Sequence, residues 1–470
     1  MSAQGKLSAE EVRQATAGRL RAGDEAVRFP EVSTDSRTLQ AGDLFLALEG
    51  RNFDGHQFVS EAFERGARGA VVRGGVWAGT PPKGGVVIEV SDTLRALGDL
   101  GRFWRGRHPV PVVAVTGSNG KTTTKEMIAA ILGQVHRVLK SEGNLNNLVG
   151  LPLALLRLEP GHTAAVVELG TNAKGEIARL AEICQPTVGL ITNIGAVHLE
   201  GLGSLQGVME EKRALYRALP PHGVAVYNAD DPGVGQAVSG VTSARLGFGV
   251  RLETDVTAEV VALTQETMQV ILTLGQGQKV AVRLQVVGLH NVYNALAAAA
   301  CALAVHTPPE AIRAGLEAFR PMAMRSQFVR LGHGITLLND AYNANPASME
   351  AALRTLGELR GGRRTIAVLG DMLELGEHAR EAHRALGQKV RVMNVDLLFA
   401  VGAFAGVVGE AACALGMEAQ RIVVGADCPA IWPALRQAVR DEDLILVKGS
   451  RGIRMEQVVE ALLAEFGPGR

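Results

Sequence analysis

A glycine-rich segment, residues 116–123, has the residue types needed to hold the phosphates of a nucleotide. It reads TGSNGKTT and follows four apolar residues, 112–115, that predict a buried strand. The residues after it, up to Leu132, have the spacing of an amphipathic helix. At such a junction, backbone N–H groups and the helix dipole point at an anion. The sequence therefore predicts a site for ATP or GTP.

Within this loop, Lys121 offers a charge to the β- and γ-phosphates, and Thr122 offers a hydroxyl to Mg²⁺. The loop is shorter than the usual Walker pattern because Val115 occupies the position of the first glycine. A glycine turn without function is the alternative, and the order of glycines, lysine and threonine favours the nucleotide site. The predicted contacts are Gly117, Ser118, Asn119, Gly120, Lys121, Thr122 and Thr123.

Two polar side chains follow other predicted strands of the same region. Glu168 comes after the apolar residues 164–167, and His198 lies four residues beyond the predicted strand 188–194. A carboxylate at a strand end can hold Mg²⁺ directly or through water, whereas a loop histidine is commonly structural. Because ligands of open α/β sheets gather at the carboxyl ends of strands, both residues are candidates for the site.

Lys212 lies on the apolar stripe of a helix predicted at residues 205–219. The neighbouring charges of Glu210, Glu211 and Arg213 are predicted to lie off this stripe. A lysine on a buried face must snorkel, pair or lose its charge. A neutral amine can react with CO₂ to form a carbamate, which resembles a carboxylate as a metal ligand. Snorkelling and carbamate formation both stay open at this point.

Length and composition limit the remaining possibilities. With 470 residues the chain should hold about two to four domains, and its formal net charge of zero argues against a nucleic-acid binder. Neither an N-terminal signal-peptide core nor a run of 18 apolar residues occurs. We expect a cytoplasmic monomer that acts on small molecules. Four separated cysteines are expected to be buried and unpaired: Cys184, Cys301, Cys413 and Cys428.

Alternating strands and helices predict an α/β protein with parallel sheets and three domains. A charged helix end meets a proline near residues 107–109, and a second boundary lies near residues 320–321. The predicted domains are residues 1–108, 109–320 and 321–470. Strands are predicted at 43–48, 85–90, 164–169, 188–194, 335–340, 365–370, 396–402, 421–425 and 443–449.

Two further segments concentrate polar groups beside predicted helices. Residues 288–301, GLHNVYNALAAAAC, begin with His290, Asn291 and Asn294 and become apolar. These amides can contact a nucleobase or can cap the helix. Residues 340–349, DAYNANPASM, place Asp, Tyr and Asn side chains between a strand and a helix, which is dense for a loop without function.

Taken together, several motifs resemble the Mur ligases of peptidoglycan synthesis. The matching segments extend from residue 33 to residue 455. Residues 33–37 (STDSR) and 42–50 resemble the domain that binds a uridine nucleotide, and residues 340–349 and 369–380 resemble the member that adds D-alanyl-D-alanine. The other matches are TGSNGKTT, GNLNN (143–147), ELG (168–170), ITNIGAVHLE (191–200), GLHNVYN (288–294) and VKGSRG (447–452).

The resemblance implies a mixed α/β N-terminal domain, a central P-loop ATPase domain with a mostly parallel sheet, and a C-terminal Rossmann-like domain. It also implies ATP-dependent amide synthesis through an acyl phosphate, with a UDP-linked muramyl tripeptide and D-Ala-D-Ala as substrates. The alternatives are a ligase like folylpolyglutamate synthase, or a nucleotide-gated binding protein that ligates nothing.

The same resemblance assigns roles to individual residues. Lys121 and Thr122 serve the phosphates and a first Mg²⁺, which Glu168 joins, while His198 and a carbamylated Lys212 hold a second Mg²⁺. Lys121, Lys212 and His198 form the catalytic set. The adenosine contacts are Asn291, Asn294, Arg325 and Asp340, and the substrate contacts are Ser36, Arg37, Asn144, Asn147, Tyr342 and Asn343.

Overall fold

The chain forms two units that are each held together by internal contacts. The computed structural model describes residues 5–50, 53–264, 266–275 and 277–468. The first unit contains residues 1–114, 137–170 and 176–187, and the second contains residues 115–136, 171–175 and 188–470. This division by contacts leaves the three predicted domains, residues 1–108, 109–320 and 321–470, as a prediction.

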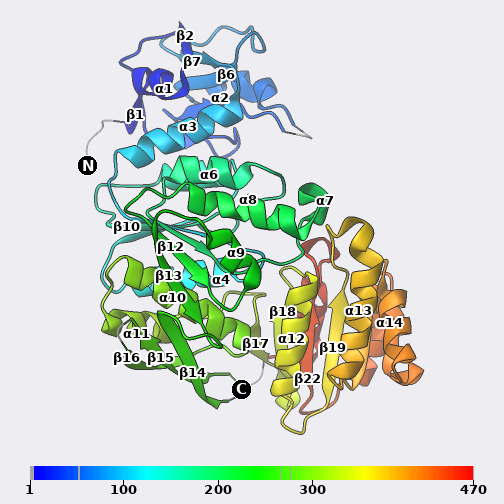
Figure 1. Ribbon diagram of the computed structural model, residues 1–470. Helices are drawn as coiled ribbons and strands as arrows, with labels where there is room; N and C mark the ends of the chain where they lie inside the picture. The colour runs from blue at the N-terminus through cyan, green and yellow to red at the C-terminus, as the bar shows by residue number, and fades with distance from the viewer. Residues whose placement is uncertain (1–4, 51–52, 265, 276, 469–470) are drawn as a thin grey trace. The chain divides into compact units, whose positions relative to one another are not determined.

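The first unit contains a five-stranded sheet with the order β2-β7-β6-β5-β4 (Figure 1). The strands β4 to β7 are parallel neighbours, and β2 joins the edge antiparallel to β7. This confirms the predicted strands 43–48 and 85–90 and adds β2, β4 and β6, which were not predicted. The strands are β2 (Arg19–Ala22), β4 (Val32–Ser33), β5 (Leu44–Leu46), β6 (Gly69–Arg73) and β7 (Val86–Val90).

Helices cover this sheet and extend the first unit. Helix α3, which Asp92 caps through the N–H of Arg95, contacts α5 and α6. Strands β9 and β10 pair in parallel, and β10 ends at Glu168. The elements are β1 (Leu7–Ser8), α1 (Ala9–Thr16), β3 (Arg28–Phe29), α2 (Val59–Glu64), α3 (Thr93–Gly106), β9 (Val138–Lys140), α5 (Gly150–Leu155), β10 (Ala164–Glu168) and α6 (Glu176–Cys184).

Strand β8 (Val112–Thr116) leads the chain into the second unit, where α4 (Lys121–Leu132) begins. The strands β11, β12, β13 and β14 are parallel neighbours, and β14, β15 and β16 form antiparallel hairpins. The hairpins were not predicted. The strands of this region are β11 (Val188–Ile191), β12 (Val224–Asn228), β13 (Ala244–Gly249), β14 (Val256–Leu263), β15 (Met268–Leu274) and β16 (Gln278–Leu284).

Apolar faces attach the helices of the second unit to these strands. Helices α8 and α9 bury Met209, Tyr216 and Val234 against Ile191 and Ala225. Helix α10 is apolar along most of its length because it contacts β11 to β13 as well as α4. The helices are α7 (Leu199–Leu202), α8 (Leu205–Arg217), α9 (Pro232–Val238), α10 (Leu289–Ala304) and α11 (Pro309–Ala318).

The second unit also contains a six-stranded sheet with the order β17-β18-β22-β19-β20-β21. All neighbours are parallel except β17 and β18, as the five predicted strands of this region required. Helix α12 packs along β22 and β19 (Figure 1). The strands are β17 (Gln327–Arg330), β18 (Thr336–Asp340), β19 (Thr365–Gly370), β20 (Leu397–Val401), β21 (Ile422–Gly425) and β22 (Leu444–Lys448).

Among the helices that accompany this sheet in the described residues, α12 and α15 begin at a capping side chain. Asn345 caps α12 by accepting from the N–H of Ser348, and Pro346 occupies the first helical position. Asp427 caps α15 in the same way. The helices are α12 (Pro346–Glu358), α13 (Ala379–Val392), α14 (Ala405–Ala414), α15 (Cys428–Ala438) and α16 (Glu456–Phe466).

The cysteine prediction holds for three of the four residues. Cys184, Cys301 and Cys428 are buried and unpaired, whereas Cys413 is unpaired but exposed, so its predicted burial is wrong. It occupies the outer side of α14, where a small apolar residue is tolerated. Within the described ranges, none of the helices is both long and apolar enough to span a bilayer.

Close packing of α11 on α4 yields a first prediction. A Cβ added at Gly315 would lie closer than 3.0 Å to backbone atoms of Ile131, so Gly315→Ala should destabilise the protein by about 1–3 kcal/mol. The matched control is Gly235→Ala in α9, where an added Cβ meets nothing within 4 Å and alanine should stabilise by ~0.5–1 kcal/mol. Urea denaturation measures both, and equal stabilities of the two variants would contradict the packing described.

Candidate active site

The phosphate loop is an open turn held from one side by the segment that follows β11. Gly117 and Gly120 have φ of +147° and +79°, values that other residues rarely adopt. The N–H groups of Ser118 and Asn119 donate to the main-chain and side-chain oxygens of Asn193 at 3.0 and 2.8 Å. The hydroxyl of Thr192 donates to the carbonyl of Asn119 at 2.6 Å. These contacts fix the conformation of the turn.

Lys121 stands at the first position of α4, directly after the left-handed Gly120. Its Nζ donates to the carbonyl of Gly117 at 2.8 Å, which holds the ammonium group against the backbone of the loop. Thr122 is buried and Thr123 is half-buried. A positive charge together with a helix N-terminus is suited to phosphate. The geometry supports the predicted phosphate-binding role of this loop.

Two asparagines of α10 form a buried chain of amide contacts to α4. The side-chain oxygen of Asn294 accepts from the hydroxyl of Thr124 at 3.2 Å, and its Nδ2 donates to Asn291 Oδ1 at 3.0 Å. Asn291 in turn donates to the carbonyl of Val287 at 2.8 Å. These amides hold α10 against the loop helix, and their contact with adenosine stays a prediction.

The prediction that Lys212 lies on the buried face of its helix is confirmed, since this residue of α8 is about 1% exposed. Burial, followed by the nearby charge of Lys121, lowers the pKa of Lys212 to about 7, and Glu211 opposes this shift. Lys212 therefore does not snorkel. A large fraction of its amine is neutral near neutral pH, as carbamate formation requires.

Glu211 lies off the apolar stripe, as expected, but it is buried all the same. Glu211 is 7% exposed and accepts from the N–H of Gly175 at 2.6 Å and from the hydroxyl of Thr171 at 3.3 Å. The segment 171–175 folds over this side of α8, so a position that points away from the helical stripe is covered by other residues. Helical periodicity alone cannot reveal such a cover.

His198 lies at the N-cap position of α7 with a positive φ of 53°. Its Nδ1 is 2.6 Å from the Oε2 of Glu374, a residue 176 positions away in the sequence. Burial and the charges of Lys121 and Lys212 lower the pKa of His198, while Glu374 acts in the opposite direction. His198, Lys121 and Lys212 thus belong to one electrostatically linked group, and their catalytic roles stay a prediction.

In the first unit, the candidates Glu168, Asn144 and Asn147 lie near the ends of strands and helices. Glu168 is buried at the end of β10, and its Oε1 accepts from Asn146 Nδ2 at 2.9 Å. Asn144 is exposed, whereas the side chain of Asn147 accepts from the N–H of Gly150 at 2.8 Å near the start of α5. Asn147 therefore has a structural task besides its predicted substrate contact.

The uridine candidates Ser36 and Arg37 differ in exposure. Ser36 is buried, while the Arg37 side chain is 81% exposed. Both Nε and Nη2 of Arg37 donate to the carboxylate of Asp35, which lowers the pKa of Asp35 to about 2. The guanidinium is thus held in one orientation at the surface, where a ligand can reach it.

Four residues predicted to be in the site lie together at the ends of β18 and β22. They are Arg325, Asp340, Tyr342 and Asn343. Arg325 stacks on the ring of Tyr342 at 3.9 Å, and the Oδ2 of Asp340 accepts from Lys448 Nζ at 2.6 Å. Lys448 also donates to the carbonyl of Asn343 at 2.9 Å. The structure places these side chains at the carboxyl edge of the parallel sheet, where ligands of such sheets bind.

Sequence reasoning missed a reciprocal contact between the phosphate loop and the cap of α12. Asn345 Nδ2 donates to Asn119 Oδ1 at 2.6 Å, and Asn119 Nδ2 is 3.3 Å from Asn345 Oδ1. Both residues were within motifs that the sequence analysis singled out. Only their pairing, across 226 positions, could not be inferred from sequence.

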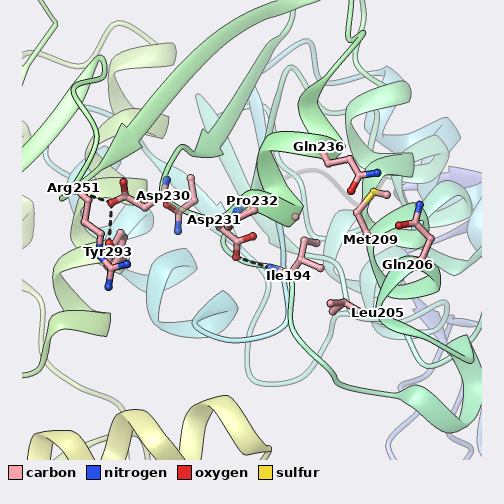
Figure 2. Close-up of a pocket in the computed structure, with 12 residues that line it drawn as sticks. Ile194, Leu205, Gln206, Met209, Asp230, Asp231, Pro232, Gln236, Arg251 and Tyr293 are labelled. Carbon is pink, nitrogen blue, oxygen red and sulfur yellow. Dashed lines mark hydrogen bonds between the residues drawn. The ribbon is translucent and has the colours of Figure 1, made fainter.

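A cavity of about 510 Å³ also escaped the sequence analysis (Figure 2). Figure 2 shows Tyr293 donating to Asp230, at 2.8 Å, and Asp231 accepting from the N–H of Ile194, at 3.0 Å. Two adjacent aspartates after β12 were the available signal. The cavity is lined by Ile194, Leu205, Gln206, Met209, Asn228, Asp230, Asp231, Pro232, Gly233, Gln236, Arg251 and Tyr293.

The described side chains offer Mg²⁺ few ligands of their own. Over the described part of the chain, no group of three or more His, Cys, Asp or Glu side chains could hold a metal ion. Nucleotide-bound Mg²⁺ needs only one or two protein oxygen ligands because phosphates and water supply the others. A hydroxyl such as that of Thr122 is one oxygen ligand of the kind that such an ion takes.

Three sequence profiles match along the chain. They describe the Mur ligase family catalytic domain at residues 28–105, the Mur ligase middle domain at 115–302 and the Mur ligase glutamate ligase domain at 324–451. A UDP-N-acetylmuramoyl-tripeptide–D-alanyl-D-alanine ligase from Bacillus subtilis (strain 168) is 36% identical, covering 92% of this chain and 93% of the relative. The chain belongs to the Mur ligase family.

Solved structures agree with this membership of the Mur ligases. A crystal structure of MurF from Acinetobacter baumannii has a TM-score of 0.89 at 34% identity and covers 97% of this chain and 98% of its own. The MurF ligase of Thermotoga maritima in complex with ADP has a TM-score of 0.82 at 27% identity, covering 93% and 97%. The predicted three-domain α/β fold class is therefore confirmed.

The left-handed turn at Gly120 generates the second prediction. Gly120→Ala forces a Cβ into this turn and against Asn294 Oδ1, and left-handed backbone alone costs about 1–2 kcal/mol. ATP affinity should therefore fall by roughly tenfold or more, as measured by calorimetry. In the control Gly195→Ala, the new Cβ makes only an ordinary contact with Ser118, so affinity should persist. Equal affinities of the two variants would contradict the described loop.

Proposed function

We propose that this Mur ligase joins D-alanyl-D-alanine to a UDP-N-acetylmuramoyl tripeptide at the expense of ATP. The observation that carries the proposal is the agreement between the phosphate loop geometry and relatives of that name over nearly the whole chain. Folylpolyglutamate synthase-like activity gives no reason for the segments at 33–37 and 340–349. That alternative is therefore not favoured.

The proposed reaction has two steps. The terminal carboxylate of the tripeptide attacks the γ-phosphorus of ATP, ADP leaves, and an acyl phosphate forms. The amine of D-Ala-D-Ala then attacks the acyl carbon, phosphate leaves with the bridging oxygen, and the nitrogen loses a proton. Lys121 and the loop N–H groups stabilise the charge that develops on the transferred phosphoryl group.

The remaining residues are assigned by the same proposal. Three domains, residues 1–108, 109–320 and 321–470, would bind the uridine substrate, ATP and the dipeptide. Arg325 and Asp340, with Asn291 and Asn294, would contact adenosine. The substrate contacts would be Ser36, Arg37, Asn144, Asn147, Tyr342 and Asn343. Four unpaired cysteines and the need for ATP support a cytoplasmic location.

Two magnesium ions complete the proposal. Thr122 and Glu168 would hold the first, and His198 with a carbamylated Lys212 would hold the second. The ions neutralise charge on the phosphates when they are bound. Support for the modification comes from Lys212 itself, because its burial favours the neutral amine that attacks CO₂.

The reaction is tested by mass spectrometry after incubation with ATP, Mg²⁺, D-Ala-D-Ala and UDP-muramyl tripeptides that differ in the third residue. A UDP-muramyl pentapeptide should form together with ADP and phosphate, and omission of either organic substrate should abolish it. A folded enzyme that binds ATP but yields no pentapeptide would overturn the proposal. Phosphate release that ignores the dipeptide would instead identify the nucleotide-gated protein.

Lys212→Arg separates a metal-binding carbamate from a buried cation. Arginine keeps the positive charge but cannot form the carbamate, so acyl-phosphate formation should be lost while ATP still binds. Because only the neutral amine reacts with CO₂, carbamate and activity should both decline as the pH falls through about 7. Carbon-13 NMR with labelled bicarbonate reports the carbamate without any turnover.

The control for this substitution is Lys279→Arg on β16, where the lysine is exposed. Lys279→Arg should retain both ligation and the labelled carbamate signal. A Lys212→Arg enzyme as active as this control would show that Lys212 acts only as a buried cation. The product test above does not depend on that result.

A further inference from the structure

The contact between Glu374 and His198 joins two segments whose backbones are both under strain. Glu374 has a φ of 62° and His198 a φ of 53°, values that non-glycine residues rarely adopt. The two side chains meet at 2.6 Å. Strained backbone persists only where surrounding contacts enforce it, and it gathers at functional sites.

Glu374 belongs to a segment that is anchored at the carboxyl ends of two central strands of the six-stranded sheet. The N–H of Leu373 donates to Ser450 Oγ at 2.9 Å, and the N–H of Met372 donates to His383 Nε2 at 3.0 Å. The N–H of Ser450 donates to the carbonyl of Asp371 at 3.0 Å. The residues preceding Glu374 are therefore fixed by the ends of β19 and β22, although its own side chain is 58% exposed.

His198 is presented by a segment anchored to the phosphate loop. The N–H of Gly195 donates to Ser118 Oγ at 2.8 Å, and Thr192 donates to the carbonyl of Asn119. Among the charged groups that act on the imidazole, Lys121 and Lys212 lower the pKa of His198 and Glu374 raises it. Glu374 is the one anion among these groups.

This geometry determines the imidazole's tautomer. A carboxylate can only accept, so a neutral imidazole beside Glu374 carries its proton on Nδ1. Its Nε2 then holds the free lone pair, which is the arrangement that carboxylate partners impose on metal-binding histidines. An isolated imidazole has no such constraint.

We propose that Glu374 is a positioning residue: it holds His198 with Nδ1 protonated and Nε2 free for the reaction site. The inference rests on the proposed ligase function and adds a residue from the C-terminal region to it. Since Glu374 and His198 belong to segments anchored on different sheets, the histidine is correctly oriented only while these segments are in contact.

The test compares Glu374→Ala with Glu377→Ala, a substitution in the same segment at a side chain that is 90% exposed. Loss of such a carboxylate partner typically costs ~10–100-fold. For Glu374→Ala we expect a fall of that size in kcat, an unchanged KM for ATP and an unchanged ATP affinity in calorimetry. Glu377→Ala should match the parent enzyme in all three.

A readout independent of turnover comes from nitrogen-15 NMR of histidine-labelled protein at alkaline pH, with His198→Gln identifying the signals of His198. The parent and Glu377→Ala should show protonated Nδ1, and Glu374→Ala should lose this preference. An unchanged tautomer in Glu374→Ala, or a kcat equal to that of Glu377→Ala, would overturn the proposal. Failure of the ligase function instead removes turnover from the parent enzyme and leaves the NMR result intact.

Discussion

The burial of Lys212 and His198 beside the charge of Lys121 is the constraint on which the rest of the site depends. Burial, followed by the nearby charge of Lys121, lowers the pKa of both groups. Both groups are therefore favoured in their neutral forms. A metal-binding imidazole and a carbamate-forming amine both require the neutral form.

The scaffold keeps this group of side chains together through contacts of its backbone. The glycines of the phosphate loop allow a turn that Asn193 and Thr192 fix, and α8 carries Lys212 on its buried face. Glu211, beside Lys212, is used to hold the segment 171–175.

Local patterns were sufficient to predict the phosphate loop, the burial of Lys212 and most parallel strands, because each depends on neighbours within one element. The pairs Asn119 with Asn345 and His198 with Glu374 could not be predicted, since their members are 226 and 176 residues apart. The hairpins β14 to β16 were missed although β15 alternates buried and less buried residues. The burial of Glu211 depends on a segment that covers α8 from outside.

The central claim is that the γ-phosphoryl group of ATP is transferred to the carboxylate of the muramyl tripeptide before the amide forms. It is tested most directly with a tripeptide substrate in which both oxygens of the terminal carboxylate are oxygen-18. Mass analysis of the released phosphate should find one labelled oxygen in each molecule, because phosphate leaves with the bridging oxygen. Phosphate without label, formed together with the amide product, would contradict the account.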